Sequence, residues 1–145
     1  MTSEGWNNLF VRERLIRFSH CDLAGIVFYP QYFVLFNDLV EDWFAEALGV
    51  GFPELHMVRG IGMPVVRVEC EFVAPSRVGD RVDMALSVTH VGNASVGLTI
   101  TCRCQGVDRL RAKLTIVSLM LAQTKSMPLP EDIRESISAF RGNLS

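Results

Sequence analysis

The segment that decides the fold is PQYFVLFNDLVEDWFAEAL, residues 30–48. Pro30 suits the first turn of a helix, where its missing N–H costs no hydrogen bond, and Gly49 suits the position just after a helix end. Apolar side chains surround almost the whole circumference of the first turns, a pattern typical of a buried helix. The remaining side is a narrow polar stripe of Asn37, Asp38, Glu41, Asp42 and Glu46. The spacing therefore predicts one long helix that needs a partner surface on most of its sides.

The segments around this helix predict strands. Residues 10–19 mix charged, aromatic and β-branched side chains, as strands do, and residues 20–29 connect them to the helix. Downstream, apolar and polar residues alternate, which indicates antiparallel strands with one buried face. These strands are expected near residues 66–72, 82–89, 95–105 and 109–121, separated by turn sequences at 75–80, 91–95 and 105–108. The last strand is apolar on both faces, which predicts a central place in the sheet.

The length of the chain, 145 residues, fits one domain with a sizeable core better than two domains. We expect a single α+β domain over residues 1–145, with its core at about 10–122. MPLP then breaks the chain, and EDIRESISAF predicts a short amphipathic helix at about 130–140.

The composition excludes several classes of protein. Hydrophobic residues make up 49% and charged residues 21%, as in globular proteins, and the net charge of −2 with scattered cations gives no reason to expect nucleic acid. No apolar run approaches the length of roughly 18 residues that spans a bilayer, and residues 1–14 lack a signal-peptide pattern. The four cysteines show no CxxC spacing, so we expect reduced thiols, a cytoplasmic location and no membrane or metal.

The connection before the helix carries a dense group of reactive side chains, from Ser19 to Asp22. The Asp22 carboxylate can attack an acyl carbon or act as a base on water, and the residues leave open which. Its alternative role is to cap a turn through its side chain. Beyond Pro30, the first N–H groups of the helix, those of residues 31–33, have no intrahelical partner and lie at the positive end of its dipole. They can stabilise an oxyanion.

The neighbouring candidates carry weaker predictions. His20 is two residues from Asp22, so on a strand the two would share a face, and His20 would tune the carboxylate or contact substrate. The alternative for His20 is a partly buried, hydrogen-bonded ring. Cys21 is expected to be a buried thiol, and the helix acids, such as Glu41, to be a solvated stripe.

The element order and the segment RFSHCDLAGIVFYPQYFVLFND, residues 17–38, together resemble the 4-hydroxybenzoyl-CoA thioesterase family of the hotdog fold. The matching positions are Asp22, Gly25, Tyr29 and Tyr32. GMPVVRVECEFVAPSRVGDRV at 62–82 and GNASVGL at 92–98 follow the family's course as well. The resemblance implies one long central helix wrapped by a curved antiparallel sheet of about five strands.

The resemblance also implies a function, the hydrolysis of an acyl-CoA thioester, with aromatic acyl groups among the candidates. Asp22 would be the catalytic nucleophile or general base, and the backbone N–H of Tyr29 or a neighbour the oxyanion donor. His20, Gly25 and Tyr32 are expected to contact substrate. Coenzyme A, part of the substrate rather than a cofactor, would meet Asn93, Ser95 and Arg111.

The implied assembly is a homodimer or homotetramer with its active site between subunits. Two other functions stay open on the same fold. One is hydration or dehydration of an enoyl thioester, and the other is binding of acyl-CoA without catalysis.

Overall fold

The computed structural model describes residues 9–142. Residues 1–8 and 143–145 lie outside the described residues. The prediction that residues 1–14 are not a signal peptide therefore concerns a segment that is mostly not described. The long helix α1 is Tyr29–Trp43, and the C-terminal helix α2 is Glu131–Gly142. The strands are β1 Phe10–Leu15, β2 Ile61–Gly62, β3 Val65–Phe72, β4 Arg81–Val91, β5 Ser95–Cys104, β6 Val107–Val117, β7 Leu119–Met120 and β8 Lys125–Ser126. Shorter helical turns are Phe18–His20, Phe44–Leu48 and Pro53–Val58.

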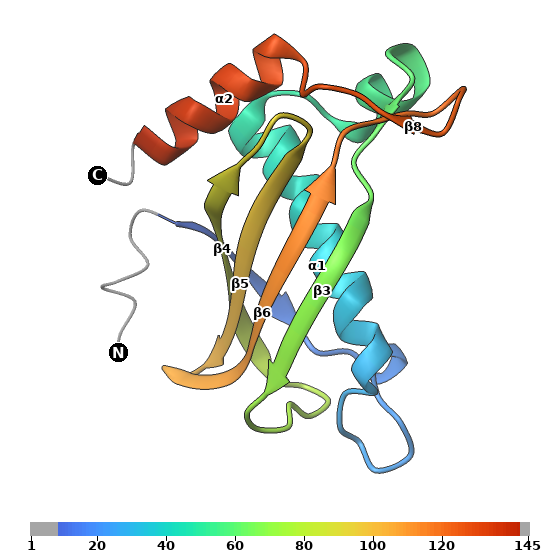
Figure 1. The fold of residues 1–145 in the computed structure, drawn as a ribbon. Helices are drawn as coiled ribbons and strands as arrows, with labels where there is room; N and C mark the ends of the chain where they lie inside the picture. The colour runs from blue at the N-terminus through green and yellow to red at the C-terminus, as the bar shows by residue number, and fades with distance from the viewer. Residues whose placement is uncertain (1–8, 143–145) are drawn as a thin grey trace.

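Five strands form one antiparallel sheet in the order β1-β4-β5-β6-β3, and α1 crosses one face of it (Figure 1). A small second sheet has the order β2-β7-β8. The predicted α+β fold with about five antiparallel strands around one long helix is confirmed. The predicted last strand, 109–121, divides into β6 and β7, and the middle of the sheet is β5 rather than β6. β6 is nevertheless paired on both edges, which explains its apolar sequence.

Helix α1 buries one side against the sheet through Tyr32, Leu35, Phe36, Leu39, Val40 and Trp43. It continues through the turn Phe44–Leu48 to Gly49, whose φ of 77° is the left-handed value that favours glycine at a helix end. The prediction of a helix buried nearly all round is wrong for the chain alone. Val34 is 48% exposed and Tyr29 57%, because the sheet covers only one side of the helix.

The polar stripe of α1 is only partly solvated, since its C-terminal half turns toward β1. Asp42 forms an ion pair with Arg14, and Glu46 forms one with Arg12. These pairs fasten the helix to the edge strand β1. No helix within residues 9–142 combines the length and the apolar character needed to cross a membrane.

Strand β3 is the opposite edge of the sheet, and its residues are exposed except for the half-buried Cys70. The predicted buried face of this strand is therefore wrong, with Val66 58% exposed and Phe72 50%. A strand at the edge of a sheet has a neighbour on one side only, and local alternation carries no information about that position. On β4, β5 and β6 the expected alternation is confirmed.

Candidate active site

The connection between β1 and α1 folds into a narrow loop, residues 21–28, closed by a β-bridge between Cys21 and Val27. The Asp22 N–H donates to the Ile26 carbonyl at 3.0 Å, and the Gly25 N–H donates back to the Asp22 carbonyl at 3.0 Å. Gly25 has a φ of 77°, so a side chain at this position would be strained. The loop is thus a defined turn rather than a slack connection.

Asp22 lies on this loop with an exposed side chain. Its Oδ1 accepts a hydrogen bond from the Ala24 N–H at 2.9 Å, the turn-capping role that a loop aspartate commonly has. Its other carboxylate oxygen has no hydrogen-bond donor within the part of the chain that the structure describes. The two predicted roles of Asp22 are therefore compatible, because one oxygen caps the turn and the other faces solvent.

The start of α1 lies directly after this loop. The Gln31 N–H donates to the Phe28 carbonyl at 2.8 Å, so the prediction that the Gln31 N–H is free is wrong. The Tyr29 N–H makes no such bond to any backbone carbonyl of residues 9–142, and Pro30 has no N–H at all. The Tyr29 N–H is therefore available as a donor at the positive end of the helix dipole.

His20 does not share a strand face with Asp22, contrary to the prediction. Residues 18–20 form a 3₁₀ turn, and the His20 Nδ1 accepts the Arg17 N–H at 2.9 Å. This bond turns the ring back along its own turn and matches the alternative of a hydrogen-bonded histidine. Cys21 is partly buried, with its Sγ 3.5 Å from the Arg17 carbonyl.

A second turn, residues 75–80 between β3 and β4, holds the loop in place. The Val27 N–H donates to the Ser76 carbonyl at 2.9 Å, and the Val78 N–H donates to the Gly25 carbonyl at 3.0 Å. These two bonds lie on either side of a β-bridge between Ile26 and the second turn. The position of the Asp22 loop is therefore set by the turn after β3.

Aromatic side chains pack where the helix begins. The Phe72 ring lies 6.3 Å from the Tyr29 ring and 6.0 Å from the Tyr32 ring, measured between centroids. Tyr32 is 4% exposed, and burial raises the pKa of its phenol. Its hydroxyl is buried without a hydrogen-bond partner among the described residues. Tyr32 thus forms part of the packed base of the site, while Tyr29 lies at its surface.

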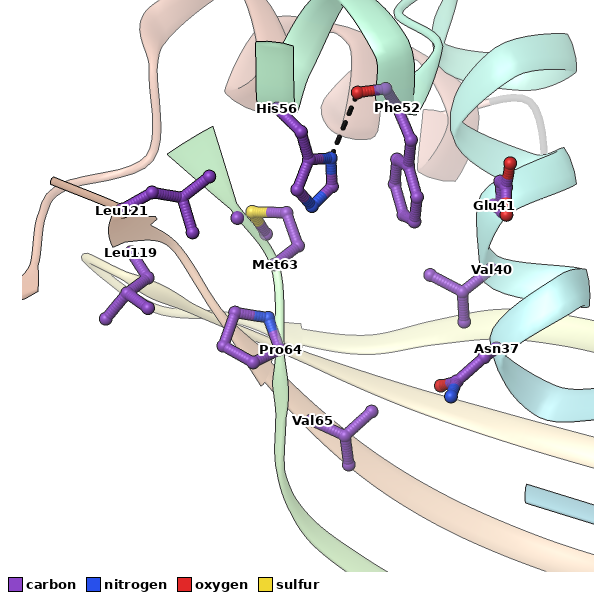
Figure 2. A pocket seen from close by; sticks show the side chains of 11 residues that line it. Asn37, Val40, Glu41, Phe52, His56, Met63, Pro64, Val65, Leu119 and Leu121 are labelled. Atoms are coloured by element: carbon purple, nitrogen blue, oxygen red, sulfur yellow. Dashed lines mark hydrogen bonds between the residues drawn. The ribbon is translucent and has the colours of Figure 1, made fainter. Parts of the chain in front are cut away.

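A cavity of about 530 Å³ opens between the middle of α1, the turn Pro53–Val58 and the start of β3 (Figure 2). Most of its lining is apolar: Val40, Phe52, Gly62, Met63, Pro64, Val65, Leu119 and Leu121. Three polar side chains, Asn37, Glu41 and His56, also line it. No local pattern of the sequence predicts this cavity, because its lining comes from segments far apart in the chain.

The tautomer of the cavity histidine follows from its hydrogen bond. The His56 Nδ1 lies 3.0 Å from the Phe52 carbonyl oxygen. A carbonyl oxygen only accepts, so Nδ1 carries a proton, and Nε2 is the acceptor whenever the ring carries no second proton. Figure 2 shows the ring pointing into the cavity beside Met63.

The three residues predicted to meet coenzyme A lie apart from the loop. Asn93 belongs to the β4–β5 turn, where its carbonyl accepts the Leu129 N–H at 2.9 Å, and Ser95 pairs with Val117. This is the opposite end of the sheet from the Asp22 loop (Figure 1). Arg111 lies on the sheet face away from α1.

Arg111 is also occupied by two carboxylates, at 3.2 Å from Glu71 and 2.8 Å from Asp108. One chain therefore brings together Asp22, Gly25, Tyr29 and Tyr32. It separates them from Asn93, Ser95 and Arg111.

Comparison with known proteins gives relatives of one kind. Residues 16–137 match the Thioesterase-like superfamily. A 1,4-dihydroxy-2-naphthoyl-CoA hydrolase of Synechococcus elongatus is 32% identical over 127 residues, which cover 85% of this chain and 90% of that protein. A protein of the same name from Thermosynechococcus vestitus is 25% identical over 122 residues, 83% of each chain.

Solved structures agree with the sequence relatives. The gentisyl-coenzyme A thioesterase BH1999 has a TM-score of 0.79 at 27% identity, covering 86% of this chain and 98% of that one. The 1,4-dihydroxy-2-naphthoyl-CoA thioesterase Slr0204 from Synechocystis has a TM-score of 0.81 at 23% identity, covering 90% and 96%.

The matched residues, 16–137, contain the long helix, the Asp22 loop and four of the five strands of the large sheet, β3 to β6. The resemblance inferred from residues 17–38 and the predicted hotdog fold are both confirmed. The chain belongs to the thioesterase-like superfamily and is a thioester hydrolase of the hotdog fold.

Proposed function

We propose that this protein hydrolyses the thioester of a hydroxylated aryl acyl-coenzyme A, with the Asp22 carboxylate as the reacting group. The observation that carries the proposal is the exposed Asp22 side chain on a short loop that ends at the unpartnered N–H of Tyr29. Thioester hydrolysis needs a group that attacks or activates water, and a donor for the carbonyl oxygen as its negative charge develops. The loop supplies the carboxylate, and the helix start supplies the N–H donor.

Two routes lead from this pair to the same products. In the first, an Asp22 oxygen attacks the thioester carbon, the C–S bond breaks, and water hydrolyses the resulting mixed anhydride. In the second, Asp22 takes a proton from water as that water attacks the same carbon, and the C–S bond then breaks. In both routes the coenzyme A thiolate takes up a proton, so the products are the free acid and the thiol.

The helix start supports the developing oxyanion in either route. The Tyr29 N–H lies where the helix dipole places partial positive charge, and this charge is fixed before the reaction begins. Gly25 leaves the loop without a side chain at its left-handed turn, and nothing lies within 4 Å of the position a Cβ would take. A substrate can therefore approach the loop backbone closely there.

We infer that the cavity and the Asp22 loop come together when two copies of the chain pair through β3. The exposed edge strand carries Val65, Val66, Val68 and Phe72, the kind of long apolar edge that associates with another strand. Antiparallel pairing of β3 with its copy places the Phe72 end of one strand beside the Val65 end of the other. The loop lies at the Phe72 end and the cavity at the Val65 end, so each site takes its carboxylate and its cavity from different copies.

The lining of the cavity suits an aromatic acyl group that carries a hydroxyl. Its walls are apolar, while the His56 Nε2 accepts a hydrogen bond and the Asn37 amide donates or accepts one. The related proteins named for 1,4-dihydroxy-2-naphthoyl-CoA and gentisyl-coenzyme A support this class of substrate. Asn93 and Ser95 lie at the same end of the sheet as the cavity and stay candidates for coenzyme A. Arg111 gains no support.

The test is the release of free thiol from a panel of thioesters: a hydroxybenzoyl-, a hydroxynaphthoyl-, a benzoyl-, a saturated fatty acyl- and an enoyl-coenzyme A. We expect the fastest release from the hydroxylated aryl thioesters. Tight binding without release would contradict hydrolysis in favour of a binding module. Hydration of the enoyl thioester without release of coenzyme A would favour the alternative of a hydratase.

A further inference from the structure

One residue of β6, Arg109, occupies an irregular position opposite β5. Residues Cys102 and Arg103 are adjacent on β5, but their partners on β6 are Leu110 and Asp108, so Arg109 is the extra residue of a β-bulge. A bulge re-aims the side chain of the extra residue, and bulges of this kind recur beside active sites. The Arg109 side chain is only 19% exposed.

Arg109 holds the turn that carries the Asp22 loop with both its backbone and its side chain. Its carbonyl accepts the Val73 N–H at 2.9 Å and the Ala74 N–H at 3.1 Å. Three further acceptors surround its Nη1, at 2.9 Å for the Pro75 carbonyl, 3.2 Å for the Ser76 Oγ and 2.9 Å for the Asp80 Oδ2. A single residue thus contacts the segment 73–80 at both ends and at its middle.

The carboxylate in this cluster is held in its charged form. The Arg77 N–H and then the Arg109 guanidinium lower the pKa of Asp80. The bond between Asp80 and Arg109 is therefore charge-assisted at neutral pH, which makes it stronger than a neutral one. The Asp80 carbonyl also accepts the Ile16 N–H at 2.8 Å, so the cluster is fastened to the chain just after β1.

The cluster reaches the reactive groups through two backbone hydrogen bonds. Ser76 accepts the Val27 N–H, and Val78 donates to the Gly25 carbonyl, on either side of the Ile26 bridge. Asp22 lies three residues before Gly25, and Tyr29 two residues after Val27. A displacement of the turn therefore moves the carboxylate and the oxyanion donor. A misplacement of about 1 Å costs on the order of 10²-fold in rate.

We propose that Arg109 is a positioning residue for thioester hydrolysis: its bulged side chain fixes the turn 75–80 and so places Asp22 against the start of α1. This inference rests on the proposed role of Asp22. Arg109 touches no reacting atom, and its effect on the rate passes through the Val27 and Val78 hydrogen bonds.

The test compares Arg109→Met and Arg109→Lys with a matched control, Arg59→Met. Arg59 also forms a partly buried ion pair with an aspartate, at 2.9 Å from Asp132 and 26% exposed, but at the other end of the molecule. Three readouts are measured on the folded fraction of each variant: kcat and KM for an aryl thioester, the melting temperature, and hydrogen exchange of the Val27 and Val78 amides.

We expect Arg109→Met to lower kcat by about 10-fold or more, with a smaller change in KM, and to speed exchange at the Val27 and Val78 amides. Arg109→Lys restores part of kcat, since its shorter side chain keeps the positive charge but brings the ammonium to only one or two of the three acceptors around Nη1. Arg59→Met lowers the melting temperature and leaves the exchange of the Val27 and Val78 amides unchanged.

Wild-type kcat in the folded Arg109→Met protein overturns the inference, as does an equal acceleration of exchange at the Val27 and Val78 amides in Arg59→Met. If Arg109→Met does not fold, Arg109→Lys decides, because wild-type kcat with wild-type exchange at Val27 excludes a positioning role. An Asp22→Asn variant is assayed beside these. Full activity in that variant overturns the proposed function itself, whatever the Arg109 variants show.

Discussion

At each end of the sheet an arginine side chain binds the backbone carbonyls of a turn, but the two turns support different parts of the molecule. At one end the Arg109 guanidinium binds the Pro75 carbonyl of the turn after β3. At the other end the Arg134 guanidinium of α2 binds the Gly92 and Asn93 carbonyls of the β4–β5 turn, at 3.1 and 2.8 Å. The first turn fixes a loop with an exposed carboxylate, and the second fixes the packing of α2. The role of each turn therefore depends on the segment that is hydrogen-bonded to it.

The two ends also differ in the part of the proposed site that each one carries. The carboxylate of Asp22 and the N–H of Tyr29 lie at the Phe72 end of β3, whereas the cavity with His56 lies at the Val65 end. A single chain therefore separates the reacting groups from the cavity proposed for the acyl group. In the proposed pairing of two copies through β3, the loop end of one copy lies beside the cavity end of the other.

The largest effect is expected when the loop end is disabled in one copy and the cavity end in the other. Asp22→Asn removes the carboxylate, and Asn37→Trp fills the cavity from an exposed position on α1. We expect each variant alone to be inactive. Mixed dimers should regain about a quarter of the wild-type activity, because half of a random mixture is heterodimer and each heterodimer has one intact site. Thiol release after subunit exchange measures this.

No regain of activity in verified heterodimers would contradict the shared site. The matched control mixes Asp22→Asn with Arg109→Met. Both changes affect the loop end, so one site of this heterodimer carries the Asp22→Asn loop, the other carries the Arg109→Met loop, and neither loop is wild type. The site formed by the Arg109→Met loop therefore sets the upper limit of activity in that mixture.

The next largest effect is expected at the strand that joins the two ends. Val68→Lys places a charge on the exposed edge of β3, where Val68 is 40% exposed. A charge on an edge strand opposes pairing with another strand. We expect the variant to be a folded monomer by sedimentation, with at least about 10-fold lower kcat/KM than the wild type. A monomer with wild-type activity would contradict the need for a second copy.

A smaller effect separates the two arginines. Arg134→Met removes two hydrogen bonds to carbonyls and should lower the free energy of unfolding by about 1–3 kcal/mol. Because the β4–β5 turn carries no reacting group, kcat per folded protein should stay at the wild-type value. Chemical denaturation and steady-state kinetics measure the two quantities. A loss of kcat as large as in Arg109→Met would contradict the claim that only the turn after β3 affects catalysis.

The smallest effect concerns the acid sensitivity of the loop end. The pKa of Asp80 is lowered in the folded protein by the Arg77 N–H and by Arg109. A lowered carboxyl pKa contributes stability that is present above the ordinary value of 3.8 and is lost as the pH falls through the folded value. Asp80→Asn removes that contribution, which we expect to be about 1 kcal/mol.

The stability difference between the wild type and Asp80→Asn should therefore be largest near pH 7 and shrink below pH 3.8. Thermal unfolding at several pH values measures it. A difference that is constant with pH would show that the Asp80 charge contributes nothing to the turn.

The sequence predicts local features of this molecule well. Helix α1 and its end at Gly49 follow from apolar spacing and one glycine, and the loop was placed by Asp22 and Pro30. Each of these depends on neighbours within a few residues. The burial of β3 was predicted wrongly, because the place of a strand at the edge of a sheet depends on pairing across the whole chain. For the same reason one side of α1 is open in a single chain.

The parts of the site that the sequence does not predict depend on how segments far apart in the chain pair and pack. Arg109 reads as one more polar residue of an alternating strand, and only the pairing of β5 with β6 reveals the bulge that turns its side chain toward Asp80. The cavity joins α1 to segments 52–65 and 119–121, which no local pattern connects. His20 was placed beside Asp22 on an assumed strand, but a 3₁₀ turn intervenes.

The most direct test of the role of Asp22 is the turnover of Asp22→Asn on an aryl acyl-coenzyme A thioester. The amide keeps an oxygen to accept the Ala24 N–H, so the loop turn is retained while the charge is lost. We expect kcat to fall on the order of 10³-fold or more, with the melting temperature and the binding of coenzyme A unchanged. A kcat within a few-fold of the wild type, in a folded protein, would contradict the assignment of Asp22 as the reacting group.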